Sequence, residues 1–250
     1  MELPPPIAVK VVYIIPADAQ PWAEAPVRAT QAVEAIQKYV SYEMNRLNHG
    51  ERTFEIERVN GLVHFTPHKS KHSKAEFEKG HARALELCKD KDLAGQPQQV
   101  YAELFIIEAY SITDGEVSGD VAGCSKRRAC VSSLHLKAAL LEWIHSDEKF
   151  FGEMFPWISP EAILNWKHRK GAKGDIAGRC FGVIAHELLH CFGAIDHDDA
   201  DGGKPGEHIM GTGRNIRTFL QGKGTVGTCM LSERSAKNMR DNLPESRSHP

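Results

Sequence analysis

Residues 186–196 read His-Glu-Leu-Leu-His-Cys-Phe-Gly-Ala-Ile-Asp, and this stretch governs how the rest of the chain is interpreted. His186 and His190 are four residues apart, so in a helix both imidazoles lie on one face and can reach a single Zn²⁺. Glu187 lies beside them, where its carboxylate can take a proton from a metal-bound water. The five-residue pattern arises by chance in roughly one sequence in twenty of this length and composition, so it needs support from its neighbours.

That support comes from the residues that follow the second histidine. Gly193 permits a sharp, left-handed exit from the helix, because glycine has no Cβ to clash in that conformation. Three residues later, Asp196 can turn back towards the metal as a third ligand. Requiring both the glycine and a His or Asp at the third place lowers the chance rate to roughly one sequence in two thousand.

The pattern from His186 to Asp196 resembles the signature of the metzincin clan of zinc metallopeptidases. It matches the variant with aspartate in place of the third histidine, which is typical of the snapalysin-like peptidases. Fourteen residues after Asp196, the run His-Ile-Met-Gly at 208–211 is similar to the Met-turn of the clan. The resemblance implies that Met210 forms an apolar floor under the metal ligands.

The resemblance also implies a mechanism. His186, His190 and Asp196 would hold one catalytic Zn²⁺ and leave a fourth position for water, with Glu187 as the general base. The chain would then be an endopeptidase that hydrolyses peptide bonds in proteins. His197 directly follows Asp196 and stays open as the third ligand, although the motif's spacing favours Asp196. The alternative function is a zinc-stabilised protein-binding domain, pseudo-peptidase or toxin-like, without turnover.

Four features depart from the family pattern or compete with it. Several metzincins carry a tyrosine two residues after the Met-turn methionine, where this chain has Thr212. Residues 136–166 look longer than a minimal clan member needs. Glu207 would be the third ligand in a gluzincin-type site, but its Gly/Pro-rich loop makes this reading weak. The acidic residues 196–203 could bind Ca²⁺, although a solvated loop is favoured over a calcium site.

The hydrophobic pattern predicts an α+β, metzincin-like fold. A twisted mixed β-sheet with packed helices would form an N-terminal subdomain at about 7–193, with the active-site helix at the cleft. An irregular C-terminal subdomain at 194–250 would end in a helix, and 1–250 would be one catalytic domain. Strands are predicted at 9–15, 53–59 and 101–109, and a loop leading into an edge strand at 115–133. Helices are predicted at 26–48, 74–88, 136–151 and 231–242.

Several cysteines, histidines and basic residues have a structural interpretation. Cys124 and Cys130 bracket a short loop and form either a disulfide or two buried thiols. Cys191 either packs below the helix or pairs with Cys229. The histidines at 64, 68 and 72 are expected in a polar surface loop, because the proline at 67 disfavours a helix. The basic run at 126–128 is expected to be a solvated turn.

Composition limits the remaining classes of function. The chain has 250 residues, a formal net charge of −2 and 41% hydrophobic residues, which is typical of an ordinary globular protein and argues against nucleic-acid binding. No apolar run approaches the roughly 20 residues of a membrane span. We therefore expect a monomer acting on a protein or peptide substrate. Residues 1–6 lack the pattern of a signal peptide, whereas the family resemblance favours an extracellular location.

Overall fold

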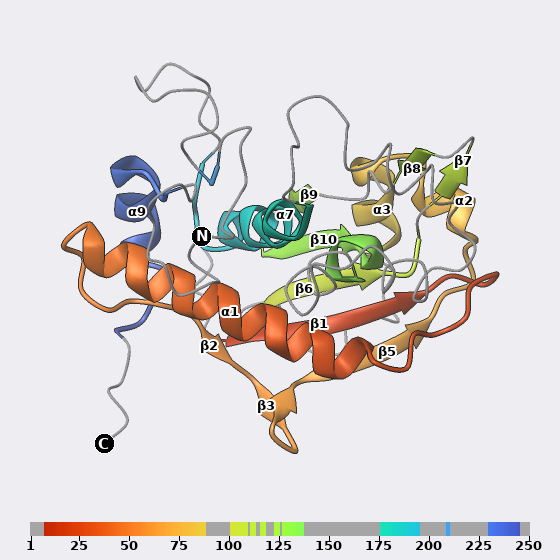
Figure 1. The fold of residues 1–250 in the computed structure, drawn as a ribbon, viewed down its shortest axis with the longest axis horizontal. Coiled ribbons are helices and arrows are strands. Elements are labelled where there is room, and N and C mark those ends of the chain that lie inside the picture. The colour runs from red at the N-terminus through yellow and green to blue at the C-terminus, as the bar shows by residue number, and fades with distance from the viewer. Residues whose placement is uncertain are drawn as a thin grey trace.

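The fold is a central mixed β-sheet with helices on both faces (Figure 1). The computed structural model describes residues 8–88, 101–109, 111–113, 116–118, 123–125, 127–137, 176–195, 209–210 and 230–245. The strands are β1 (Ala8–Ile15), β2 (Glu55–Ile56), β3 (Arg58–Val59), β4 (Leu62–Val63), β5 (Phe65–Lys69), β6 (Tyr101–Ile107), β7 (Ser111–Thr113), β8 (Glu116–Ser118), β9 (Gly123–Ser125) and β10 (Arg128–Ser132). The helices are α1 (Ala25–Arg46), α2 (Lys74–Phe77), α3 (His81–Leu87), α7 (Ile176–His190) and α9 (Glu233–Arg240).

The main sheet has the strand order β2-β1-β6-β10-β9, and β5 also pairs with β1. Its strands run parallel except β9, which is antiparallel to β10. All eight residues of β1 are buried, which explains why this strand is apolar on both faces apart from Lys10 rather than alternating. The predicted fold class is confirmed, since the sheet is mixed, helices pack against it, and a helix lies near the C-terminus. No helix in the described part of the chain is long and apolar enough to cross a membrane.

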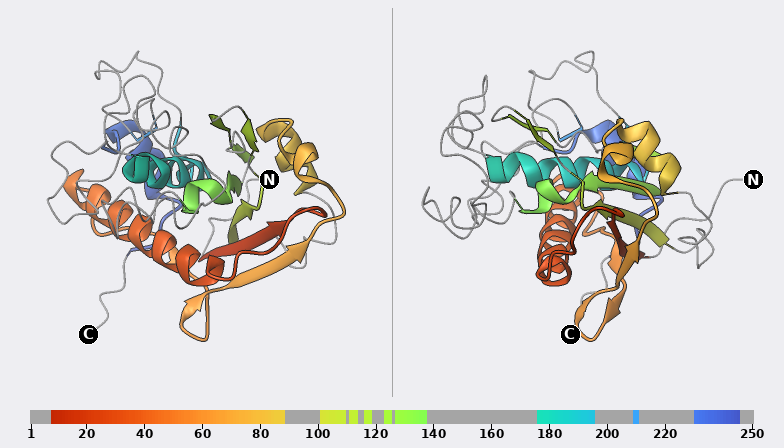
Figure 2. Two further views of the ribbon diagram at one scale, coloured as in Figure 1. Left: turned by 45° about the vertical axis from the view of Figure 1, so that its right-hand side comes forward. Right: turned by 90° about the vertical axis from the view of Figure 1, so that its right-hand side faces the viewer.

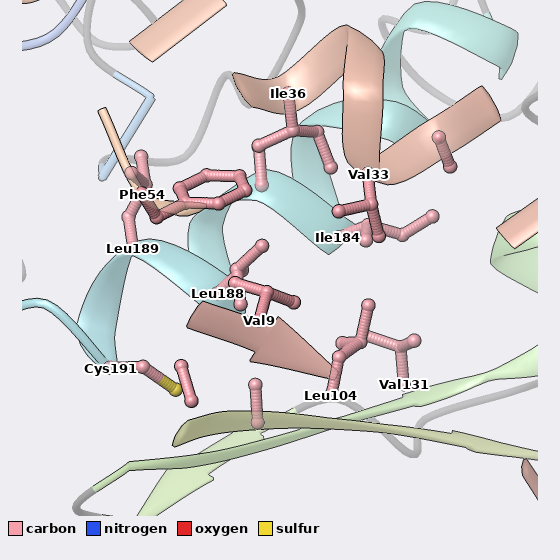
Figure 3. Packing of buried hydrophobic residues seen from close by; sticks show 14 of the residues in the cluster. Val9, Val33, Ile36, Phe54, Leu104, Val131, Ile184, Leu188, Leu189 and Cys191 are labelled. Carbon is pink, nitrogen blue, oxygen red and sulfur yellow. The ribbon is translucent and has the colours of Figure 1, made fainter. Parts of the chain in front are cut away.

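Successive residues of β1 point to opposite faces of the sheet and so enter two separate cores. Val9 packs with Val33 and Ile36 of α1 and with Leu188 of α7 (Figure 3). On the opposite face, Val12 belongs to a smaller cluster with residues of α2 and α3. Figure 2 shows α1 and α7 on one side of the sheet and α3 on the other. The larger core therefore holds α7 in a fixed position between the sheet and α1.

Two predicted elements are divided in the structure. The single strand predicted at 53–59 is wrong, because the chain leaves the main sheet at Glu57 and forms the β3–β4 hairpin. Asn60 and Gly61 make the hairpin turn with φ angles of 53° and 82°, the left-handed pair of a type I′ turn. The helix predicted at 74–88 is likewise two helices, α2 and α3. Gly80, with φ 108°, breaks it between them.

Two segments take a different place in the sheet from the one predicted. Residues 65–69, predicted as surface loop, form β5 parallel to β1, and Pro67 is tolerated because β5 pairs with β1 alone. The strand predicted at the edge after residue 115 is internal, because β10 lies between β6 and β9. The short β9 takes the edge position. Of the helix predicted at 136–151, the structure describes only residues 136 and 137, which are helical.

Burial decides between the alternatives for Cys130 and corrects the expectation for Arg128. Of a disulfide and a buried thiol, the structure favours the buried thiol for Cys130; the strand register places Gly123, not Cys124, opposite it. Burial also raises the pKa of the Cys88 thiol to about 12. The turn expected at 126–128 is not solvated at Arg128, which is 6% exposed and donates from Nε to Glu103 Oε2 at 2.8 Å.

Candidate metal centre

Helix α7 carries the histidine pair because its opposite side is anchored in the larger core. Ile184, Leu188 and Leu189 are each at most 1% exposed and pack towards the sheet and α1 (Figure 3). His186, at 2% exposure, is also buried, while His190 is half-buried. The apolar stripe thus fixes the rotation of the helix and, with it, the direction in which both imidazoles project.

The two imidazoles face each other closely. His186 Nε2 and His190 Nε2 are 3.2 Å apart, and the ring planes are inclined by 89° with centroids 4.8 Å apart. One ligand atom each from His186, Glu187 and His190 lie within 4.8 Å of one another. Glu187 is 5% exposed, so its carboxylate lies beside this pair in a largely buried environment.

The outer nitrogen of each ring is held by a backbone carbonyl. His186 Nδ1 lies 3.0 Å from the carbonyl oxygen of Ile209, and His190 Nδ1 lies 2.9 Å from that of Ala194. A carbonyl oxygen can only accept, so each Nδ1 must carry the proton and donate it. In a neutral imidazole this leaves Nε2 with a lone pair, and the two Nε2 atoms lie 3.2 Å apart.

This arrangement fits a divalent transition metal. Two lone pairs 3.2 Å apart repel unless a cation or a shared proton lies between them. Zinc–nitrogen bonds of about 2.0–2.1 Å at a tetrahedral angle place two nitrogens roughly 3.3 Å apart, close to the observed separation. Imidazoles fixed at Nδ1 by backbone carbonyls are also the usual surroundings of zinc-ligating histidines. The residues present therefore fit Zn²⁺ in both donor type and spacing.

The turn after α7 brings the second carbonyl into place. Gly193 has φ 99°, so the predicted left-handed exit from the helix is confirmed. The turn closes with Gly193 N donating to the His190 carbonyl at 3.1 Å and Ala194 N donating to the Leu189 carbonyl at 3.2 Å. Asn242 Nδ2 donates to the Phe192 carbonyl at 3.0 Å and holds the turn from outside. The same turn thereby carries the Ala194 oxygen back to His190.

We predict that Gly193→Ala lowers the free energy of unfolding by about 1–3 kcal/mol and weakens zinc binding. A Cβ at this position would lie 3.1 Å from Asn242 Nδ2, in addition to the strain of a positive φ. Gly61→Ala is the matched control, because Gly61 also has a positive φ, 82°, but has nothing within 4 Å of the added Cβ. Urea denaturation and zinc titration should show the larger loss for Gly193→Ala. Equal losses in both variants would contradict this account.

Ile209 and Met210 form a buried turn beneath the histidines' helix. Met210 is 2% exposed and belongs to the same core cluster as Leu188 and Leu189. The Ile209 amide donates to the Met230 carbonyl at 2.9 Å, and the Ile209 carbonyl accepts from His186. The methionine identified in the sequence is thus part of the core that supports α7.

The remaining predicted site residues divide into two groups. Cys191 is a buried, reduced thiol whose Sγ lies 3.9 Å from the Glu187 carbonyl, which favours packing below the helix over pairing with Cys229. The other predicted site positions lie outside the described residues: Asp196, His197, the acidic segment 196–203, Glu207 and Thr212. Sequence reasoning missed the carbonyls of Ile209 and Ala194, because backbone acceptors leave no residue-type signal.

Comparison with known proteins shows the fold. No protein-family model matches the chain, and no curated protein matches it in sequence. Wild-type OgpA from Akkermansia muciniphila matches with a TM-score of 0.64 and 17% identity over 96% of this chain and 62% of OgpA. Catalytically inactive OgpA, crystallised with an O-glycopeptide (glycodrosocin) substrate, matches with a TM-score of 0.61 and 18% identity over 96% and 61% of the two chains. Archaemetzincin from Methanopyrus kandleri gives a TM-score of 0.39 and 13% identity over 94% and 95%.

The OgpA matches, with TM-scores above 0.6, show that the chain shares its fold with a solved structure. The chain spans about three fifths of the length of OgpA, 62%. At 17–18% identity the likeness concerns the course of the backbone, and what OgpA acts on does not carry over with it. The chemistry of this chain therefore has to be argued from its own histidines and glutamate.

Proposed function

We propose that this chain is a metzincin-like zinc peptidase that hydrolyses peptide bonds in proteins or glycopeptides. The observation that carries the proposal is the pair of Nε2 atoms 3.2 Å apart on α7, each with its Nδ1 held by a carbonyl and with Glu187 adjacent. The fold likeness to OgpA, which has been crystallised with an O-glycopeptide substrate, adds glycosylated peptides to the substrates worth testing.

In this proposal His186 and His190 supply two zinc ligands through Nε2. Asp196 supplies the third, on the motif spacing, with His197 as the alternative. Met210 forms the apolar floor of the site, which its burial next to Ile209 supports. The whole chain, 1–250, would be one catalytic domain with subdomains at about 7–193 and 194–250. The hydrogen bonds that Leu231, two residues before α9, makes with Glu43 and Arg46 of α1 support such a close association.

When bound, zinc would supply Lewis acidity for activating water and polarising the scissile carbonyl. Glu187 accepts the proton that the attacking water loses and passes it to the leaving amine nitrogen, so the new C–O bond and the broken C–N bond balance. His186 and His190 stay aligned because their Nδ1–H groups are held by the carbonyls of Ile209 and Ala194. The burial of Glu187 keeps its carboxylate away from bulk water.

The test measures zinc content together with cleavage of a denatured protein and of an O-glycopeptide. The proposal expects one zinc per chain and cleavage that a chelator abolishes and added zinc restores. A zinc-free chain would overturn it. Full zinc loading without cleavage of any substrate would instead indicate a zinc-stabilised binding domain.

We also predict that zinc stabilises the fold and that His190→Ala removes this effect. A ligand that binds only the folded state adds about 4 kcal/mol when present at a thousand times its dissociation constant. Thermal melts with zinc and with chelator should therefore differ in the parent chain and coincide in His190→Ala. His68→Ala is the control, because His68 lies on edge strand β5, on the sheet rather than on α7. Zinc-independent melting of the parent would contradict the prediction.

A further inference from the structure

The carbonyl that fixes His186 is itself held by a chain of hydrogen bonds that ends on α1. Ile209 N donates to the Met230 carbonyl at 2.9 Å, so the neighbouring residue Leu231 sets where that carbonyl lies. Leu231 N donates to Glu43 Oε2 at 2.7 Å, and Arg46 Nη2 donates to the Leu231 carbonyl at 2.9 Å. The Glu43–Arg46 ion pair thus hydrogen-bonds both the amide and the carbonyl of Leu231.

Glu43 is an unusual residue to find at this place in a core helix. It is fully buried at 0% exposure, and its carboxylate accepts from Arg46 Nε at 3.1 Å and from Arg46 Nη2 at 2.8 Å. A buried carboxylate costs free energy unless it is paired and hydrogen-bonded. An apolar residue would fill the same space with a smaller desolvation cost. The bonds that a hydrophobic residue could not make are those to Arg46 and to Leu231.

We infer that Glu43, together with Arg46, is a positioning residue for His186, acting through the backbone of Leu231, Met230 and Ile209. The inference rests on the proposed function, because it takes His186 as a metal ligand. Groups that orient a ligating imidazole typically change metal affinity by about 10–100-fold when removed. Glu43 acts through intervening backbone, so we expect a change near the lower end of that range.

The same region supports the other histidine as well. Helix α9 begins just after Leu231, where Ser232 Oγ accepts from Ser235 N at 3.1 Å and caps the helix. Ser235 Oγ donates to the Ile195 carbonyl at 3.3 Å, next to the Ala194 carbonyl that His190 uses. Leu231 therefore lies between the support of His186 and the start of α9, and Ser235 of α9 bonds the residue next to the support of His190.

The test compares Glu43→Gln with Glu103→Gln. Both substitutions remove one buried carboxylate charge that is paired with arginine, but Glu103 lies on the sheet face opposite α7 and pairs with Lys10 and Arg128 of the neighbouring strands. Zinc dissociation constants are measured by competition with a chelating dye. We expect about tenfold weaker zinc binding for Glu43→Gln and an unchanged constant for Glu103→Gln, whatever each costs in stability.

A second measurement works without metal. In the zinc-free protein, ¹⁵N NMR of the imidazoles reports whether the His186 proton stays on Nδ1. Glu43→Gln should shift His186 towards a mixture of tautomers, a change that loss of stability alone would not produce. Parent-like zinc affinity and an unchanged tautomer in Glu43→Gln would overturn the inference.

Two further outcomes are separable. Should Glu43→Gln fail to fold, Arg46→Lys replaces it as the test variant. Lysine keeps the positive charge but lacks the two parallel N–H donors of the guanidinium. Parent-like zinc affinity and an unchanged His186 tautomer in Arg46→Lys would equally overturn the inference. Should the parent chain bind no zinc, the proposed function fails, while the tautomer measurement still decides whether Glu43 positions His186.

Discussion

Glu187→Gln should bind zinc as tightly as the parent chain and lose about 10²–10⁴-fold in kcat. Glutamine keeps the size of the side chain and an acceptor oxygen, but an amide cannot take a proton from water at neutral pH. The histidines and the carbonyls that hold their Nδ1 atoms are untouched by this change. Zinc content and initial rates of peptide cleavage, measured on the same preparation, separate the two effects.

Glu187→Asp is the informative companion variant. It keeps the negative charge but withdraws the carboxylate by one methylene, so it should retain zinc and recover part of the lost rate. Parent-like turnover in Glu187→Gln would remove Glu187 from the mechanism. Loss of zinc in the same variant would show that its carboxylate acts in metal binding rather than in proton transfer.

The parts of the fold that sequence reasoning predicted are those with a strong local signal. The apolar run of β1 and the amphipathic spacing of α1 each span enough residues to identify the element. The helix α7 follows from its motif, and the structure brings His186, Glu187 and His190 together as the helical spacing predicts. Gly193 signals its own backbone conformation, because a positive φ is where glycine is favoured.

The errors have physical causes that act over longer distances. β5 contains Pro67 and polar residues, so only its pairing with β1 makes it a strand. Gly80 breaks a helix whose side-chain pattern continues on both sides of it. Asn60-Gly61 is a local signal for the β3–β4 hairpin, because both residues readily adopt the positive φ of a type I′ turn. Local composition can suggest such breaks, but which strand pairs with which depends on the whole sheet.

The supports of the candidate site lie beyond local reasoning for a different reason. The Ile209 carbonyl lies 23 residues from His186, and Leu231 lies 188 residues from Glu43. Neither a backbone carbonyl nor a glutamate in a helix indicates its partner by type. Arg128 was misjudged in the same way, since three consecutive basic residues suggest a solvated turn until Glu103 is found beside them.

The second large effect concerns stability: we expect Glu103→Ala to lower the free energy of unfolding by about 3–5 kcal/mol. Glu103 is 1% exposed and lies in register between Lys10 on one neighbouring strand and Arg128 on the other. It pairs with Lys10 Nζ at 3.0 Å and with Arg128 Nε at 2.8 Å. Alanine would leave two largely buried cations, on the strands either side of β6, without the carboxylate that pairs with both, which is costlier than losing the contacts themselves.

A triple variant distinguishes two contributions to stability: the free-energy cost of leaving Lys10 and Arg128 unpaired, and the stabilisation that their ion pairs with Glu103 provide. Lys10→Met, Glu103→Leu and Arg128→Met together replace the three charged side chains with apolar ones of similar length. Proteins whose buried ion pairs are replaced in this way commonly lose little or no stability. We therefore expect the triple variant to be more stable in urea denaturation than Glu103→Ala alone, although it changes two more residues. A loss below about 1 kcal/mol in Glu103→Ala would mean that water reaches these charges.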